Sequence, residues 1–263
     1  MIMGIINTSP DSFFPGSRRQ SVDGVLEMAA EMIGSGADIL DIGGYSTRPG
    51  AEDISLDEEL SRVIPPIAAI SKTYPECIIS IDTFRSAVAE NALGAGASLI
   101  NDISGGQLDE NMFRTVSRLK VPYILMHMKG NPRTMKLMSE YDNLFKEIAV
   151  YFNNRISELH NLGVNDIILD VGFGFAKKIG QNYELLRNLS YFNIFGLPLL
   201  AGVSRKSMIY KTLHLTADKA MNGTTVLNTI ALLKKASILR VHDVREATET
   251  ITLLKRGNFD ILN

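Results

Sequence analysis

The sequence has almost no cysteine, no tryptophan and no long hydrophobic run. Cys77 is the one cysteine in 263 residues, so no intrachain disulfide can form and nothing indicates an oxidising compartment. The formal net charge is −2, so no overall basic field favours nucleic acid or anionic lipid. The apolar run in residues 1–7 is too short for a signal peptide or a membrane span. We therefore expect a cytoplasmic protein that binds neither nucleic acid nor membranes.

The chain does have enough apolar residues to build a large core. Hydrophobic residues make up 45% of it and charged residues 21%, which is typical of a folded protein rather than a disordered one. Its length is ordinary for one α/β barrel. No Pro/Ser-rich linker or shift in composition interrupts it, so we expect a single domain over residues 1–263.

Short apolar runs alternate with longer amphipathic segments from end to end. Several runs, such as Ile167-Ile168-Leu169, are apolar without alternation, which is typical of parallel strands buried on both faces. The runs predict strands at 2–6, 38–42, 78–82, 98–101, 122–127, 167–170, 198–202 and 238–241.

The segments between these runs have helical spacing of apolar residues. Ser55-Leu-Asp-Glu58 reads as a capping box at the start of one of them. The pattern predicts helices at 22–34, 56–72, 85–95, 109–119, 139–162, 180–191, 217–236 and 243–256. Eight strand–helix units favour a TIM (β/α)8 barrel of the α/β class. A doubly wound open sheet is the alternative, disfavoured because no Gly-x-Gly-x-x-Gly turn follows the first strand.

Polar and glycine-rich clusters follow nearly every predicted strand, whereas the connections from helix to strand are plain. Turn chemistry explains any one such cluster, but a barrel brings all of its strand ends to one rim, where active sites of this architecture lie. We therefore expect an active site built from the clusters at residues 7–16, 41–50, 81–83, 100–106, 125–128, 170–177, 202–207 and 239–243.

Two clusters indicate an anionic ligand. Arg240 and His242 alternate along the last strand, so both point the same way, and they precede a helix whose first N–H groups can bind an anion. Ser204-Arg205-Lys206-Ser207 adds cationic donors after the preceding strand, at the position where barrels commonly bind phosphate. The alternatives are a surface Arg with a capping His, and a solvated charged loop.

Acidic and amide side chains at other strand ends suit a flat heterocycle. Asp82, Asp102 and Asp170 stand at strand ends, with Asn101 and Lys206, and a carboxylate beside an amide can accept adjacent N–H donors. A turn or cap role for Asn101 and Asp102 is the alternative.

Histidine and cysteine do not indicate a metal centre. His127 lies in an apolar run and reads as a buried core histidine rather than a ligand, and Cys/His metal spacing is absent. Mg²⁺ remains possible through Asn7 and phosphate oxygens of the ligand, because this ion needs few protein ligands.

Read together, these motifs make the chain resemble the dihydropteroate synthase family over essentially its whole length. The first motif differs from the family's usual Asn-Val-Thr-Pro-Asp-Ser-Phe at residues 8 and 9. The motifs that carry the resemblance are Met3-Gly-Ile-Ile-Asn7-Thr-Ser-Pro-Asp-Ser-Phe13, Gly43-Gly-Tyr-Ser-Thr-Arg-Pro-Gly-Ala51, Ile81-Asp82-Thr83, Asn101-Asp-Ile-Ser-Gly105, Leu125-Met-His-Met128, Asp170-Val-Gly-Phe-Gly-Phe175, Ser204-Arg-Lys-Ser-Met208 and Arg240-Val-His242.

The resemblance implies a β/α barrel that condenses 6-hydroxymethyl-7,8-dihydropterin diphosphate with 4-aminobenzoate in folate synthesis. It implies a pterin pocket of Asp82, Asn101, Ile103, Met126, Asp170 and Lys206. It implies pyrophosphate contacts from Thr47, Arg48, Arg240 and His242, and an aminobenzoate site of Phe13, Pro49, Phe175, Lys206 and Ser207. Asn7 then resembles the Mg²⁺ ligand, and the residues closest to the chemistry are Asp82, Lys206, Arg240 and His242. Relatives of this family commonly form homodimers.

The implied reaction is a dissociative substitution, in which pyrophosphate leaves and the aromatic amine attacks a pterin methylene cation. It needs no nucleophilic side chain, and the sequence has no Ser/His/Asp or Cys/His arrangement. Two rivals remain: a pterin-dependent methyltransferase, which has no pyrophosphate for Arg240 and His242 to hold, and a barrel kept as an inert binding module.

Overall fold

The computed structural model describes residues 1–8, 21–46 and 53–261. Four of the predicted site residues, Phe13, Thr47, Arg48 and Pro49, lie outside this part of the chain.

Eight parallel strands form a closed barrel in which each strand pairs with the next and the last pairs with the first. The predicted TIM barrel is therefore confirmed and the open doubly wound sheet is excluded. The strands are β1 (Ile2–Asn7), β2 (Ile39–Gly43), β3 (Ile78–Asp82), β4 (Leu99–Asp102), β5 (Tyr123–Met126), β6 (Ile167–Asp170), β7 (Leu199–Ala201) and β8 (Ile238–Val241).

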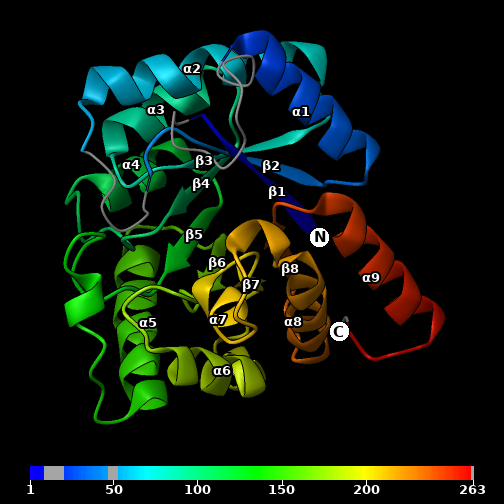
Figure 1. Cartoon of the computed structure of the whole chain (residues 1–263). Helices are drawn as coiled ribbons and strands as arrows, with labels where there is room; N and C mark the ends of the chain where they lie inside the picture. Colours follow the sequence, from blue (N-terminus) through cyan, green and yellow to red (C-terminus); the bar gives the residue numbers. More distant parts are fainter. Residues whose placement is uncertain (9–20, 47–52, 262–263) are drawn as a thin grey trace.

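Helices surround the barrel (Figure 1). They are α1 (Val22–Gly34), α2 (Leu56–Thr73), α3 (Ser86–Gly94), α4 (Met112–Leu119), α5 (Leu144–Asn161), α6 (Ile179–Arg187), α7 (Ser207–Tyr210), α8 (Met221–Leu233) and α9 (Val244–Arg256), with short 3-10 turns η2 (Met135–Leu137), η3 (Leu189–Phe195) and η4 (Ala217–Lys219). Within the described residues, no helix combines the length and the apolar character needed to cross a bilayer.

Several predicted helices are shorter than expected, among them those at 109–119 and 180–191, which form α4 and α6. Two others differ most. The helix predicted from residue 139 begins at Leu144, because the Asn143 side chain caps it by accepting a hydrogen bond from the Lys146 backbone N–H. The helix predicted over 217–236 is divided into η4 and α8 around Ala220. Local capping decides the first of these boundaries, which hydrophobic spacing alone does not reveal.

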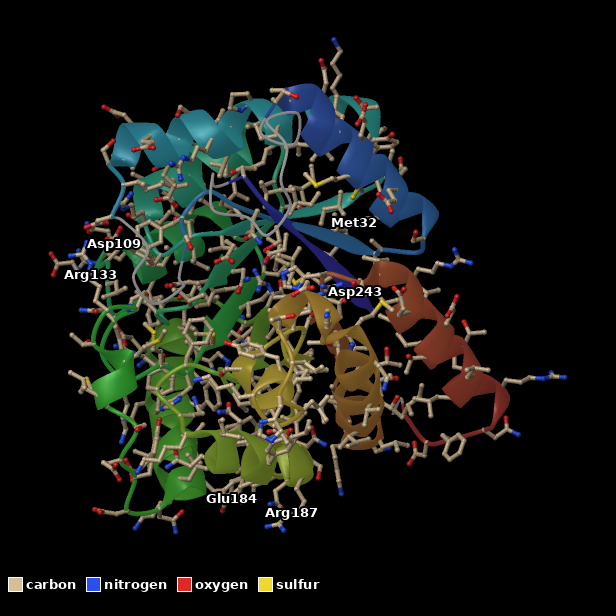
Figure 2. All side chains as sticks on the ribbon, viewed as in Figure 1. Met32, Asp109, Arg133, Glu184, Arg187 and Asp243 are labelled. Carbon is tan, nitrogen blue, oxygen red and sulfur yellow. The ribbon has the colours of Figure 1, made fainter. Side chains whose placement is uncertain are left out.

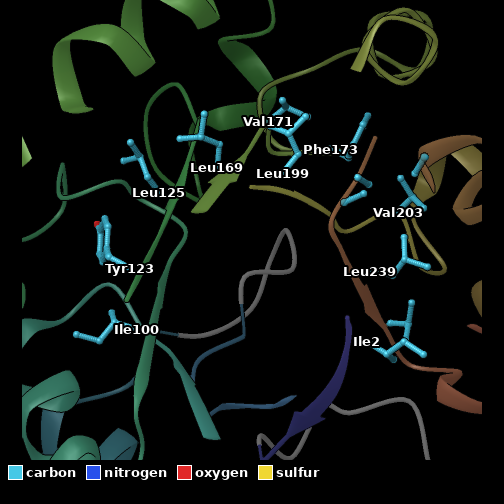
Figure 3. Close-up of a cluster of buried hydrophobic side chains, with 14 of the residues drawn as sticks. Ile2, Ile100, Tyr123, Leu125, Leu169, Val171, Phe173, Leu199, Val203 and Leu239 are labelled. Carbon is cyan, nitrogen blue, oxygen red and sulfur yellow. The ribbon is translucent and has the colours of Figure 1, made fainter. Parts of the chain in front are cut away.

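Side chains on each strand alternate between the helices and the barrel interior. Outward residues such as Leu125, Leu169 and Leu239 pack into the large core between strands and helices (Figure 3). Inward residues near the strand starts form a separate apolar layer that fills the barrel below the rim. Its buried members are Met3, Ile39, Leu99, Ile124, Leu200 and Ile238.

One glycine lets two helices lie close to β1. A Cβ atom at Gly4 would stand 2.7 Å from the sulfur of Met32 in α1 and 3.1 Å from a methyl of Val244 in α9. Met32 lies on α1, and Asp243 lies where α9 begins beside the barrel (Figure 2). A larger side chain at residue 4 would therefore push α1 and α9 away from the strand that closes the barrel.

Candidate active site

The predicted site residues on the strands point into the barrel, as the side chains of the apolar layer do. Asn101, Met126 and Arg240 each stand two residues beyond a member of that layer on the same strand. Because alternate strand residues face one side, their side chains enter the barrel at its carboxyl-terminal rim. Asp82 and Asn101 are paired in register on β3 and β4, so strand phase brings the predicted residues together.

Arg240 lies between two carboxylates at the centre of this rim. Its Nε donates to Asp41 Oδ2 at 2.6 Å, and its terminal NH2 donates to Asp82 Oδ2 at 2.6 Å. Asn101 Nδ2 also donates to Asp41 Oδ2, at 3.0 Å. Four strands, β2, β3, β4 and β8, therefore meet in one polar network.

Asp41 is a member of the site that the sequence pattern does not single out. Its carboxylate is fully buried, and within the described residues its Oδ1 has no hydrogen-bond partner. The available signal is an acid at an inward position of the otherwise apolar strand β2. A buried carboxylate needs a cationic partner, and Arg240 supplies it.

The same network changes the expected role of Arg240. The sequence predicts a side chain directed at an anionic ligand, whereas two of its donors are engaged by Asp41 and Asp82. Burial raises the pKa of Asp82 to about 7, although Arg240 opposes the shift; Asp41 adds to it. The charge of Asp82 is therefore sensitive to pH near neutrality.

Asp170 and Lys206 form a second polar group across the rim. Asp170 Oδ1 accepts from the Gly172 backbone N–H at 2.8 Å. Lys206 Nζ donates to the Phe173 carbonyl and lies 4.9 Å from the centroid of the Phe175 ring. Burial lowers the pKa of Lys206 to about 8, with Asp170 opposing the shift. Burial raises the pKa of Asp170, and Lys206 is the strongest opposing influence.

An apolar wall stands beside these polar groups. Ile103 and Met126, both predicted to contact the heterocycle, are buried in one cluster, and Phe175 packs against it half-buried. The other members are Met128, Met135, Ala176 and Phe84. The wall offers flat apolar contact next to hydrogen-bonding groups, which is the composition of a small-molecule site.

His242 and Ser204 connect the last two strand ends. Ser204 Oγ lies 3.0 Å from His242 Nδ1, and the His242 backbone N–H donates to the same oxygen at 3.2 Å. This contact fixes the orientation of the imidazole. Ser207 is half-buried and begins α7, which is four residues long.

Two expected ligand contacts are structural instead. Arg205 forms a bidentate pair with Asp243, with N–O distances of 2.9 and 2.6 Å, so it ties the loop after β7 to α9 rather than facing a ligand. Arg205 has a positive φ of 53°, and its side chain points away from that of Lys206. Asp102 faces outward and accepts from the Tyr123 hydroxyl and the Ser104 and Gly106 backbone N–H groups.

His127 is a buried core histidine, as predicted. Its Nδ1 lies 3.0 Å from Lys177 Nζ, and its ring packs edge-on against Tyr151. Burial, followed by the charge of Lys177, lowers the pKa of His127 well below its ordinary value. The imidazole is therefore neutral at physiological pH.

Asn7 ends β1 beside Gly43 of β2 and is half-buried. In residues 1–8, 21–46 and 53–261, no group of three or more His, Cys, Asp or Glu is arranged to hold a metal ion. A magnesium ion at Asn7 would therefore take most of its oxygens from the ligand and water, which Mg²⁺ accepts.

Comparison with known proteins shows the family to which this barrel belongs. Residues 3–242 match the family of pterin binding enzymes. The dihydropteroate synthase of Escherichia coli (strain K12) is 40% identical over 256 residues, covering 97% of this chain and 90% of the relative. That of Synechocystis is 45% identical over 246 residues, covering 92% and 85%.

Solved structures of dihydropteroate synthases have the same fold as this chain. The Yersinia pestis dihydropteroate synthase with a sulfonamide drug complex superimposes with a TM-score of 0.93 at 39% identity, covering 97% of this chain and 93% of that one. The Xanthomonas albilineans enzyme with 4-aminobenzoic acid gives 0.90 at 34% identity, covering 97% and 92%. The chain therefore belongs to the pterin binding enzymes and, within them, to the dihydropteroate synthase family of C–N bond-forming transferases.

Proposed function

We propose that the barrel rim joins 6-hydroxymethyl-7,8-dihydropterin diphosphate to 4-aminobenzoate, releasing pyrophosphate and forming 7,8-dihydropteroate. The observation that carries the residue assignment is the convergence of Asp41, Asp82, Asn101 and Arg240 opposite Asp170 and Lys206. This arrangement offers acceptors for a heterocycle's N–H groups and cations for its diphosphate in one polar, partly buried space.

The pterin lies between the two polar groups in this proposal. Asp170 and Asn101 bind its edge, and Lys206 donates from the loop after β7. Ile103 and Met126 contact its face. Asp82 is the acid nearest the methylene carbon, where positive charge develops when pyrophosphate leaves.

The leaving pyrophosphate is held by Arg240 and His242, with Thr47 and Arg48 assigned from the sequence motif. A guanidinium has five N–H donors, so Arg240 can donate to a phosphate oxygen while it keeps its bonds to Asp41 and Asp82. Ser204 contacts His242 through Nδ1 and so fixes the orientation of the imidazole at this end of the site.

Magnesium belongs to this half of the site. Asn7 ends β1 four residues beyond Met3 of the apolar layer, on the same side of the strand, and beside Gly43. Its amide oxygen therefore suits a hard cation that phosphate oxygens also bind. When bound, Mg²⁺ neutralises charge on the departing pyrophosphate.

The aminobenzoate site uses Phe175, Lys206 and Ser207, with Phe13 and Pro49 assigned from the sequence motif. The Phe175 ring packs with the apolar wall and lies against Lys206, so an aromatic ring can stack there. The Ser207 hydroxyl and backbone N–H suit the carboxylate. The neutral amine then attacks the pterin carbon, which requires no protein nucleophile.

A homodimer is proposed on the faces of η3, α7 and α8. Helices α6, α7 and α8 pack against one another. Large apolar side chains are exposed on η3, on α8 and in the segment after α7, where a second copy would cover them. The side chains are Tyr191, Ile194, Leu213, Leu215, Met221, Val226 and Leu233. A cytoplasmic location is consistent with one unpaired cysteine, Cys77.

The direct test mixes the protein with the pterin diphosphate, 4-aminobenzoate and Mg²⁺ and assays dihydropteroate and pyrophosphate together. Equimolar formation of both products supports the proposal. A pterin-dependent methyltransferase or an inert binding module would form neither, and would bind no aminobenzoate.

A further inference from the structure

The loop between β6 and α6 carries site groups along its length. Asp170 precedes it, the Phe173 carbonyl accepts from Lys206, and Phe175 presents its ring to the apolar wall. Its backbone is unusual, with positive φ at Gly172 (70°), Gly174 (80°) and Ala176 (48°). Such a conformation has to be held by surrounding contacts.

Lys177 supplies these contacts from a largely buried position. Its Nζ lies 3.0 Å from the Phe175 carbonyl, 3.1 Å from the Gly172 carbonyl and 3.0 Å from His127 Nδ1. The His127 carbonyl lies further from Nζ, at 3.4 Å, so each of the three nearest acceptors can take one of the three N–H donors of the ammonium. Two belong to the loop and one to the end of β5, and the ammonium therefore joins the loop to the barrel.

The groups closest to Lys177 Nζ are acceptors, but the nearby charges are mixed and the ammonium predominates only below about pH 7. His127 stays neutral, so its Nδ1 can accept. Burial lowers the pKa of Lys177 to about 7, Asp170 opposes the shift, and Lys206 and Lys129 add to it. Lys177 in turn favours the ionised form of Asp170. The ammonium thus interacts electrostatically with the carboxylate that is proposed to bind the pterin.

We propose that Lys177 is a positioning residue whose ammonium holds the loop after β6 so that Phe175 faces the aminobenzoate position. It contacts neither substrate and acts through the Gly172 and Phe175 carbonyls and His127. The backbone of Asp170 is fixed in β6, although its Oδ1 accepts from the Gly172 N–H, whereas Phe175 lies wholly on the loop. Aminobenzoate binding should therefore depend on Lys177 more than pterin binding does. This inference rests on the proposed function.

The first test compares Lys177→Met with Lys178→Met. Lys178 is the adjacent lysine, and its exposed side chain pairs with Glu140 on the surface. Lys177→Met should raise the KM for aminobenzoate by about tenfold, the scale of losing buried charged hydrogen bonds, with kcat within about twofold and pterin affinity within about threefold. Lys178→Met should match the wild type.

A readout without catalysis separates this inference from the proposed function. Amide hydrogen exchange over residues 172–177 should accelerate in Lys177→Met and not in Lys178→Met, whatever reaction the enzyme catalyses. If the wild type makes no dihydropteroate, the proposed function fails. If it does, and Lys177→Met keeps its KM and its exchange pattern, the positioning role is wrong.

Chemical rescue covers the case in which Lys177→Met folds poorly. Lys177→Ala opens space for a small cation, so ethylammonium should restore the aminobenzoate KM and ethanol should not. Rescue by both, by neither, or a uniform fall in kcat and both affinities would contradict a role for the ammonium and indicate general loss of structure.

Discussion

The NH2 group of Arg240 donates to Asp82 Oδ2 at 2.6 Å, although 158 positions separate the two residues in sequence. Nε of the same guanidinium pairs with Asp41, whose side chain is 0% exposed. Arg240 therefore acts in two ways. It neutralises the buried Asp41 and the partly buried Asp82, and it can donate its remaining N–H groups to the pyrophosphate. A substitution there affects stability and ligand binding together.

Arg240→Met should therefore destabilise the fold as well as weaken binding of the pterin diphosphate. Removing one partner of a buried ion pair costs roughly 3–5 kcal/mol, because it leaves an uncompensated charge. Urea denaturation measures this. The double variant Arg240→Met with Asp41→Asn should lose less than the sum of the two single variants, because the orphaned charge is gone. Strict additivity would mean that the pair contributes nothing to stability.

Asp170→Asn and Asp102→Asn form a matched pair of carboxylates at strand ends. Asp170 faces the site, so its amide would turn an acceptor into a donor opposite the pterin's donors, with a loss of about 1.5–3 kcal/mol or ten- to a hundredfold in pterin affinity. Asp102 faces outward and holds Tyr123 and the Ser104 turn, so its variant should lose stability and keep pterin affinity. Calorimetry and thermal melts separate the two. Equal pterin losses would place both in the pocket.

Asp102 also shows what the sequence pattern does not predict, namely which of two neighbouring polar residues faces the site. Strand runs and rim clusters locate the site because strand order and phase follow from apolar patterning. Neighbours on one strand nevertheless face opposite ways, so Asn101 enters the barrel while Asp102 serves a turn. Likewise Lys206 faces the site while Arg205, at φ 53°, pairs with Asp243.

Asp41 illustrates a different limit. Asp41 interrupts an apolar strand. The apolar run predicts that Asp41 is buried, but it does not identify the residue that pairs with its carboxylate. Only the closure of β8 against β1 brings Arg240 to it. Long-range pairing between charged residues is set by barrel geometry, which no local pattern encodes.

Asp82→Asn should lose turnover more than ground-state binding. At an effective dielectric near 20, a unit pair about 4 Å apart interacts by ~4 kcal/mol, up to roughly a thousandfold in rate. Stopped-flow or steady-state kcat tests this against pterin affinity. A loss confined to affinity, with kcat preserved, would remove Asp82 from charge stabilisation.

The pKa of Asp82 also predicts a pH dependence. Its folded-state pKa of about 7 lies above the ordinary value of 3.8, so the folded state binds more protons between these values and the contribution of Asp82 to the free energy of unfolding falls as pH rises through about 7. The rate constant kcat/KM should rise over the same range, as the carboxylate forms. Asp82→Asn should flatten both profiles; an unchanged profile would assign them to another group.

Asn7→Ala should weaken Mg²⁺-dependent binding of the pterin diphosphate and leave the unphosphorylated hydroxymethyl pterin unaffected, because only the diphosphate shares the ion. Chelation of Mg²⁺ in the wild type should have the same selective effect. Titration of both ligands with and without Mg²⁺ measures it. If the variant and the wild type respond alike to chelation, the ion binds elsewhere.

Lys206 offers the most specific test of charge at the site. An arginine at this position carries the same positive charge but does not lose its proton in the accessible pH range. Burial lowers the pKa of Lys206 to about 8 from 10.5, so the ammonium is lost as pH rises through about 8. The sign of the linkage is opposite for stability: the unfolded state binds more protons between these values, so the contribution of Lys206 to the free energy of unfolding increases with pH there. Pterin affinity should therefore fall above pH 8 while stability does not.

Calorimetric titration of the pterin between pH 7 and pH 9.5 checks this prediction. Lys206→Arg carries a group that stays charged throughout the range, so its affinity, although reduced by altered geometry, should change little with pH. Lys206→Met should bind weakly at every pH, because it has neither the charge nor the donor. If Lys206→Arg keeps the full decline above pH 8, the titrating group is not Lys206.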